Sequence, residues 1–283
     1  MAYAGGKDGP GVWQRTINQI TPHDVFVSAF AGDCAVSRHI RHAQAMILID
    51  RDLDVIRSWQ KRQWPGLLLS CADSIGWLRS SFLLQEATRK TVGSSADGRR
   101  GKSSLKYTGW QPVKARKLFE PPAWQPGADA FFSGMVPGQN LNQFPRVFVY
   151  LDPPYLLSTR TKKKIYKHEL TTDDHWELLR IARLLPCHVL IHGYPSNMYG
   201  QKLHDWRSFT FLASTRGGQR TEQVWCNYPD PQELHDYSYV GENRRVRERI
   251  ARRRRNWLAA LKRVGPHERG AILQALLPLA PKQ

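Results

Sequence analysis

Four consecutive residues, Asp152-Pro153-Pro154-Tyr155, have the types needed to hold a planar group that carries an exocyclic amine. Two prolines remove two backbone N–H donors and fix φ, so the neighbouring carbonyl oxygens have few partners within the turn. The Asp152 carboxylate adds an acceptor, and the Tyr155 ring adds an aromatic face. An adenine turned out of a duplex is such a group. A proline-rich loop with an unrelated aspartate is the alternative interpretation.

Three further aspartates, Asp33, Asp50 and Asp73, stand like Asp152 at or just past the end of an apolar run. These runs are typical of buried strands, and they cover residues 25–30, 45–50, 67–73, 146–152 and 188–193. Helical patterns cover residues 34–42, 53–63 and 75–87, and a fourth begins at 171–174 and ends before Pro186. Strands alternating with helices predict a three-layer α/β domain with a mostly parallel sheet. Ligands of such sheets bind beyond the carboxyl ends of the strands, where all four aspartates would lie.

The alternation breaks between residues 88 and 145, where Gly, Ser, Lys, Arg, Pro and Trp dominate. We interpret this segment as an insertion into one discontinuous domain made of residues 1–87 and 146–230. Residues 231–283 would form a basic helical extension, in which Arg252–Arg255 lie on a helix with the apolar positions Ile250, Trp257, Leu258 and Leu261. That apolar side would pack on the body or on a second subunit, and a fully solvated helix is the alternative.

With these motifs in this order, the chain resembles the Dam-like DNA adenine N6-methyltransferases of the alpha group, particularly phage and prophage members. The resemblance runs over nearly the whole chain. Asp152–Tyr155 resembles the catalytic DPPY motif, Tyr3-Ala4-Gly5-Gly6-Lys7 the N-terminal GGK motif, and residues 27–33 lie in the place of the glycine-rich cofactor loop. Residues 191–194 and 220–228 resemble two weaker downstream motifs.

The resemblance implies a Rossmann-like fold that binds S-adenosylmethionine, with residues 88–145 as the target-recognition insert. The implied catalytic residues are Asp152, Pro153, Pro154 and Tyr155. The implied cofactor contacts are Tyr3, Gly5, Gly6, Lys7, Phe30, Gly32, Asp50 on the ribose, Asp73 beside the cofactor's adenine, and Asp152.

The chain departs from the family at Ser28, which is usually an acid, and at Ala31 and Asp33, which are usually glycines. These departures leave open a DNA-binding pseudoenzyme of the same fold. An RNA or cytosine-N4 methyltransferase is a second alternative.

The expected reaction is transfer of a methyl group to the N6 amine of a flipped adenine in double-stranded DNA. The amine is a poor nucleophile because its lone pair is delocalised into the ring. Acceptors at Asp152 and at the Pro153 carbonyl would favour a pyramidal nitrogen and direct its lone pair at the methyl group. Positioning and electrostatics would then supply most of the acceleration, and Asp152 need not be a strong base.

The charge of the chain is concentrated in two segments. The 42 Lys and Arg exceed the 24 Asp and Glu and give a net charge of +18, of which residues 88–117 contribute +8 and residues 244–263 contribute +9. Such patches fit a polyanion, either nucleic acid or an anionic membrane surface, and solvated charge is the alternative. We expect DNA to contact basic and aromatic residues of the insert and a run after the DPPY motif: Arg99, Arg100, Lys102, Lys106, Tyr107, Trp110, Arg160, Lys162, Lys163, Lys164 and Lys167.

The remaining composition predicts a cytoplasmic protein, which would lie in the bacterial host cytoplasm if the chain is phage-encoded. The four cysteines, at positions 34, 71, 187 and 226, form no close Cys/His ligand set, so we expect reduced thiols and no metal, with Cys34 in a packing role. No secretory signal or membrane-spanning run is evident. Whether the protein is a monomer or a homodimer, which DNA sequence it recognises, and whether it belongs to restriction-modification or to regulation stay open.

Overall fold

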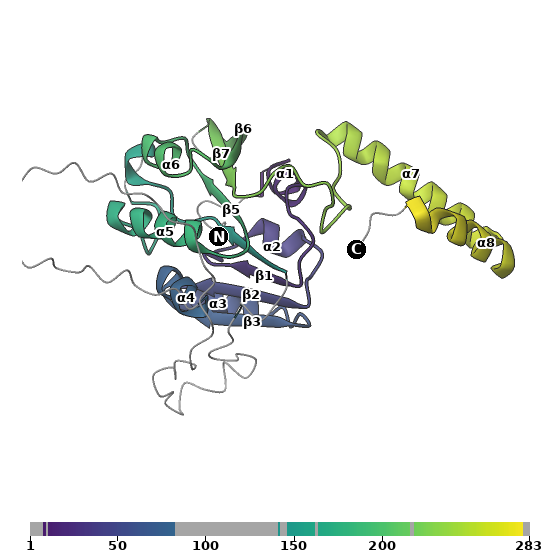
Figure 1. Cartoon of the computed structure of the whole chain (residues 1–283), viewed down its shortest axis with the longest axis horizontal. Coiled ribbons are helices and arrows are strands. Elements are labelled where there is room, and N and C mark those ends of the chain that lie inside the picture. Colours follow the sequence, from purple (N-terminus) through teal and green to yellow (C-terminus); the bar gives the residue numbers. More distant parts are fainter. Residues whose placement is uncertain are drawn as a thin grey trace, which may run out of the picture.

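The computed structural model describes residues 8–9, 11–82, 141, 146–161, 164–215 and 218–279. Its centre is one sheet of seven strands in the order β3-β2-β1-β4-β5-β7-β6, with helices on both faces (Figure 1). Strands β1 to β5 run parallel, whereas β7 is antiparallel to both β5 and β6. The strands are β1 (Val25–Ser28), β2 (Ala45–Asp50), β3 (Leu67–Cys71), β4 (Val147–Leu151), β5 (His188–Gly193), β6 (Arg207–Thr215) and β7 (Gly218–Cys226).

The helices fall into a group around the sheet and a pair at the C-terminal end. Around the sheet lie α1 (Val12–Ile17), α2 (Ala35–His39), α3 (Leu53–Gln60), α4 (Ser74–Ser81), α5 (Thr172–Leu184) and α6 (Asn197–Lys202), with a short 3₁₀ turn at Leu157–Thr159. The pair consists of α7 (Arg244–Arg263) and α8 (Pro266–Leu276), followed by a 3₁₀ turn at Leu277–Leu279. Figure 1 shows this pair extending away from the sheet. None of the helices in the described ranges has both the length and the hydropathy of a membrane span.

Local sequence explains where several helices begin. Asp52 and Asp73 are the N-caps of α3 and α4, and each carboxylate accepts a hydrogen bond from a first-turn amide. Thr171 and Asp174 form a reciprocal capping box at the start of α5. Side-chain caps satisfy amides that have no partner inside the helix, so these acids and hydroxyls fix the helix starts next to the sheet.

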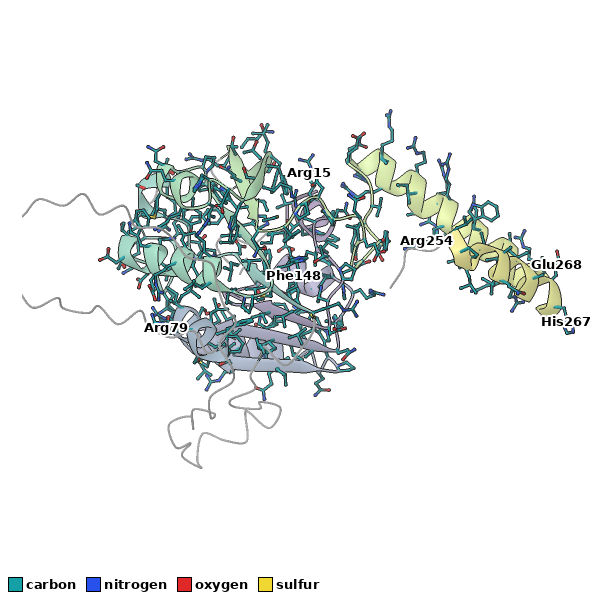
Figure 2. The ribbon with its side chains drawn as sticks, in the orientation of Figure 1. Arg15, Arg79, Phe148, Arg254, His267 and Glu268 are labelled. Carbon is teal, nitrogen blue, oxygen red and sulfur yellow. The ribbon has the colours of Figure 1, made fainter. Side chains whose placement is uncertain are left out.

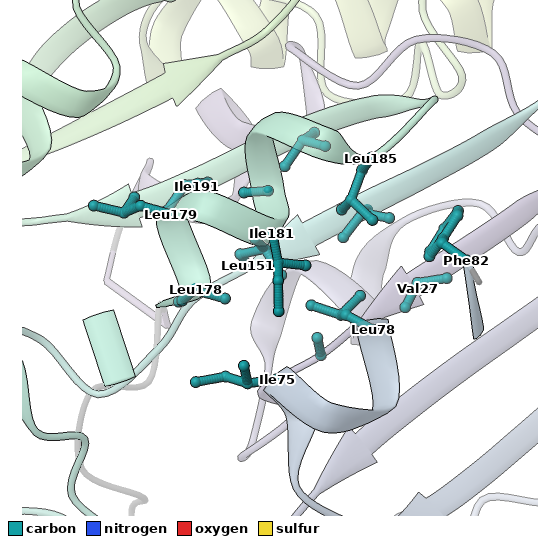
Figure 3. Close-up of a cluster of buried hydrophobic side chains, with 14 of the residues drawn as sticks. Val27, Ile75, Leu78, Phe82, Leu151, Leu178, Leu179, Ile181, Leu185 and Ile191 are labelled. Carbon is teal, nitrogen blue, oxygen red and sulfur yellow. The ribbon is translucent and has the colours of Figure 1, made fainter. Parts of the chain in front are cut away.

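Alternate side chains along the parallel strands fill two separate cores. On one face, Val27, Val149 and Ile191 pack with residues of α4 and α5 (Figure 3). On the other face, Phe26 and Phe148 pack with residues of α1, α2 and α3. Because successive strand residues point to opposite faces, strands apolar at every position require helices on both sides. The structure is therefore a three-layer α/β domain with a mostly parallel sheet, compatible with a Rossmann-like fold.

The five predicted strands and four predicted helices are all present, with ends that differ by a few residues. The predicted helix at 34–42 ends at His39, and those at 53–63 and 75–87 end at Gln60 and Ser81. The sequence pattern predicts neither α1 and α6 nor the antiparallel hairpin of β6 and β7. The Arg-rich run lies on a helix as expected, but its apolar side does not pack on the body at Trp257, whose side chain is 70% exposed.

Candidate active site

The switch point of the sheet lies between β1 and β4, because the chain proceeds outward in opposite directions from these two neighbouring strands. Residues 29–33 follow the carboxyl end of β1, and Asp152 follows the carboxyl end of β4. Ser28 and Tyr150 are partners in the β1–β4 register, so the two loops leave the sheet side by side. Ligands of open α/β sheets bind outside such a switch point. The predicted cofactor loop and the DPPY turn therefore share the position where a ligand is expected.

The turn after β1 is held on both sides of Gly32. The Gly32 amide donates to Asp50 Oδ2 at 2.8 Å, and the Trp59 indole Nε1 donates to the Gly32 carbonyl at 2.8 Å. Gly32 has a φ of 41°, in the left-handed region that glycine adopts without the cost of a Cβ. Phe30 on the same turn is half-buried against the core next to α4 and α5. The turn thus keeps a fixed backbone path even though Ala31 and Asp33 replace the expected glycines.

Asp50 has a geometry that suits a ribose. Its Oδ2 accepts from Gly32, and its Oδ1 accepts from the Asp52 amide at 2.8 Å. A carboxylate has about four acceptor sites, so two such bonds fix its orientation and leave capacity for two hydroxyl groups. Burial raises the pKa of Asp50 from its ordinary value, and the two amide bonds oppose that shift. The side chain is only half-buried, so the residues present fit the ribose of a nucleoside cofactor.

Asp73 and Asp33 are engaged in other contacts. Asp73 Oδ2 accepts from the Gly76 amide at 2.7 Å, and Oδ1 accepts from Arg51 at 2.6 Å. Asp33 forms an ion pair with Arg38, at 3.3 Å between Oδ1 and Nε. Asp73 therefore caps α4 at the carboxyl edge of β3, and its predicted contact with the cofactor's adenine stays a prediction.

The DPPY turn is surrounded by phenols that stay protonated. Burial and the Asp152 charge raise the pKa of both Tyr150 and Tyr155 well above the usual value. The Tyr155 side chain is only 5% exposed, and its ring meets Tyr194 edge-on with the centroids 4.6 Å apart. Pro153 is buried and Pro154 half-buried. The Tyr155 ring is therefore largely covered, and its stacking on a base stays a prediction.

A row of buried polar side chains continues behind the turn on the face that α1 covers. Thr16 Oγ1 donates to the Val12 carbonyl and lies 3.1 Å from His192 Nε2. The other ring nitrogen, His192 Nδ1, faces Glu222 Oε2 at 3.4 Å. Ser28, fully buried at the end of β1, has no hydrogen-bond partner for its hydroxyl within the described residues. No role was predicted for Thr16, whereas Glu222 lies in the weaker motif that the resemblance identified at residues 220–228.

The basic run after the DPPY turn divides into buried and exposed members. Arg160 Nη1 and Nη2 donate hydrogen bonds to the two carboxylate oxygens of Glu169, at 3.1 and 2.6 Å. The Arg160 side chain is 3% exposed. Lys167 Nζ donates to Asp52 Oδ1 at 2.8 Å. Lys164 is exposed. Arg160, predicted to contact DNA, is therefore placed as a structural arginine whose charge Glu169 already neutralises, and Lys167 ties this loop to the start of α3.

Many predicted contacts lie outside the described residues. These are Tyr3, Gly5, Gly6 and Lys7 for the cofactor, and Arg99, Arg100, Lys102, Lys106, Tyr107, Trp110, Lys162 and Lys163 for DNA. The same holds for nearly all of the predicted insert. Within the described ranges, no group of three or more His, Cys, Asp and Glu side chains is arranged to hold a metal ion.

Comparisons with known proteins find only remote similarity to solved structures. No family model and no curated protein matches the chain. A crystal structure of Thermoplasma acidophilum 1320 aligns with 73% of this chain and 79% of its own, at 8% identity and a TM-score of 0.36. Precorrin 8W decarboxylase from Methanobacterium thermoautotrophicum aligns with 76% of this chain and 86% of its own, at 10% identity and a TM-score of 0.35.

Proposed function

We propose that the chain is an S-adenosylmethionine-dependent DNA methyltransferase that acts on the N6 amine of adenine. The observation that carries the proposal is the placement of Asp152-Pro153-Pro154-Tyr155 beside the turn that follows β1, at the switch point of the sheet. An antiparallel last strand inserted next to β5 also fits the methyltransferase variant of the Rossmann-like fold. It differs from the dinucleotide-binding order, in which the last strand lies at the edge.

The residues of this chain would bind and orient two ligands. Asp50 would accept the ribose hydroxyls of the cofactor, with its carboxylate held by the Gly32 and Asp52 amides. Asp152 and the Pro153 carbonyl would accept hydrogen bonds from the adenine amine and favour a pyramidal nitrogen. The cofactor, when bound, supplies an electrophilic methyl group. Holding the amine in line with that group lowers the barrier chiefly by positioning, and the surplus proton leaves the nitrogen after the new bond has formed.

The test is the methylation of DNA in a host that lacks N6-methyladenine. We expect N6-methyladenine in digested host DNA after expression of the wild type, by mass spectrometry, and none above background with Asp152→Ala. Asp173→Asn, an exposed carboxylate on α5, is the matched control and should methylate like the wild type. Methylation at cytosine N4 or in RNA alone would refute the proposal. Measurable DNA binding without any methylation would favour the pseudoenzyme.

A second experiment separates the cofactor site from the DNA site. Asp50→Asn replaces one acceptor oxygen by an amide nitrogen that cannot accept from Gly32 or Asp52. We expect cofactor binding, measured by calorimetry, to weaken by at least about tenfold, equivalent to roughly one lost hydrogen bond of 1.4 kcal/mol. DNA affinity should be unchanged. Equal loss of both would show misfolding instead of a cofactor contact.

A further inference from the structure

Helix α7 has a charge that the candidate active site does not use. Its twenty residues include ten basic side chains, nine of them arginine, and Glu248 is the only acid. Glu248 pairs with Arg244 at 2.6 Å, one turn along the helix. None of the α7 residues is buried. Nine basic groups therefore have no acid on their own helix to neutralise them.

Most of these charges lie along one side of α7. With 3.6 residues per turn, one side of the helix carries Arg245, Arg249, Arg252 and Arg255. The other side carries the half-exposed Val246 and Ile250. Figure 2 shows α7 and α8, with Arg254, His267 and Glu268 labelled, extending away from the sheet. From Arg245 to Lys262 the helix rises about 25 Å at 1.5 Å per residue. Over that length duplex DNA presents roughly 15 phosphate charges.

The positive surface continues onto the body at the root of the helix. Arg247 donates to the Gly241 carbonyl at 3.3 Å, which fixes the first turn of α7 to the preceding loop. Burial, and after it the nearby charge of Arg15 on α1, lowers the pKa of Arg247. Because the Arg247 side chain reaches Gly11, the N-cap of α1, the positive charge of α7 adjoins that of Arg15 on α1.

We propose that the arginine side of α7 binds the phosphate backbone of double-stranded DNA, outside the duplex segment at the candidate active site. Arginine presents a planar fork that pairs with two phosphate oxygens, and lysine does not. A second copy of the chain is disfavoured on this side because it would oppose +9 with +9. A membrane surface is disfavoured because the apolar side is small: Val246, Ile250, Trp257, Leu258 and Leu261 are five large apolar residues against ten basic ones on the same helix. The choice of DNA as the polyanion rests on the proposed function.

The experiment compares the salt dependence of DNA affinity in three full-length proteins. These are the wild type, Arg252→Gln/Arg255→Gln on α7, and Lys61→Gln/Lys202→Gln, which removes the same charge from exposed positions of the body. Glutamine keeps a similar helix propensity, so α7 should persist, and circular dichroism checks this. Binding is measured by fluorescence anisotropy on a duplex of arbitrary sequence.

We expect the α7 variant to reduce the slope of log affinity against log salt by about 1.8, or about 0.9 for each lost phosphate contact. Between 50 and 200 mM salt its affinity would then fall about 12-fold less than that of the wild type. The control should keep the wild-type slope. Equal slopes in all three proteins would overturn the proposal.

Two further outcomes would also overturn the proposal. In the first, the α7 variant loses binding to phosphatidylserine vesicles while its DNA affinity keeps the wild-type salt slope. In the second, the α7 variant keeps the wild-type salt slope but differs from the wild type in a concentration-dependent oligomeric state. Methylation is measured separately, so a wild type that binds DNA through α7 without methylating it refutes the proposed function and leaves this inference standing.

Discussion

Replacement of Arg160 by methionine should destabilise the protein without changing the salt dependence of its DNA affinity. Arg160 makes two charge-assisted hydrogen bonds to Glu169, whose carboxylate also accepts from the Ile165 and Tyr166 amides at 2.9 and 3.0 Å. Burial alone would raise the pKa of Glu169, but the hydrogen bonds from Arg160 and from these two amides lower it below its usual value. One carboxylate therefore holds the loop that follows the DPPY turn, and Arg160 is its principal partner.

The expected loss follows from the two bonds and the exposure of the pair. Each hydrogen bond to a charged group is worth about 1.5–3 kcal/mol, and breaking a buried pair costs about 3–5 kcal/mol. The Glu169 side chain is 22% exposed, so water compensates part of this loss. We expect Arg160→Met to lower the free energy of unfolding by about 2–4 kcal/mol. Arg160→Lys should recover only part of it, because an ammonium lacks the two-pronged geometry.

Urea unfolding and salt-dependent DNA binding, measured on the same proteins, separate the two roles. Lys164→Gln is the comparison variant, because Lys164 is exposed and lies on the same loop. It should change stability by less than about 0.5 kcal/mol. If Lys164 contacts a phosphate, its loss should reduce the salt slope by about 0.9. The opposite pattern, a stable Arg160→Met with a reduced slope, would refute the structural role of Arg160.

Two further predictions concern stability. Burial, chiefly, lowers the pKa of His23 to about 3 and of His175 to about 4, so both stay neutral when folded and protonate near pH 6.5 when unfolded. Stability should therefore fall as pH drops below 6.5, by about 2 kcal/mol per histidine between pH 7 and 5; urea unfolding that is unchanged at pH 5 would contradict this. Gly66→Ala should cost more than about 2 kcal/mol in thermal unfolding, because Gly66 has a φ of 70° and a Cβ there would lie 2.2 Å from the Gln44 carbonyl oxygen. Gly200→Ala is the control, since a Cβ on that residue of α6 meets no atom within 4 Å; a comparable loss there would show that the Gly66 effect is not local.

The parallel part of the sheet could be predicted because its strands are apolar without interruption. All five residues of β4 are buried, and such runs between two helical patterns permit few other structures. The positions of Asp50 and Asp152 followed from the same pattern, since each acid marks a strand end. By contrast, β6 carries polar residues, and only some of its side chains are buried. The alternation of Phe209, Phe211 and Ala213 toward one core is a weaker signal, and no strand was predicted there.

The contacts of charged side chains could not be predicted from the local sequence. Arg160 and Lys164 stand in one basic run, yet one is buried against Glu169 and the other is exposed. That distinction depends on the path of the loop, which brings Glu169 back nine residues later. Likewise, Asp50 and Asp73 look alike at strand ends. Only the fold shows that Gly32 orients the first, whereas Arg51 pairs with the second.

The position of β1 in the middle of the sheet has a consequence for biosynthesis. Strand β1 pairs with β2 on one side and β4 on the other, and β4 begins only after residues 82–146 have been made. At about 5–20 residues per second, the ribosome needs roughly 3–13 s to add these about 65 residues. During that time a nascent β1–β2–β3 sheet would present an apolar strand with an unpaired edge, which is a template for association with other chains. Retention by a nascent-chain chaperone until β4 emerges would protect this edge, so the yield of folded protein should depend on chaperone supply more than its final stability suggests.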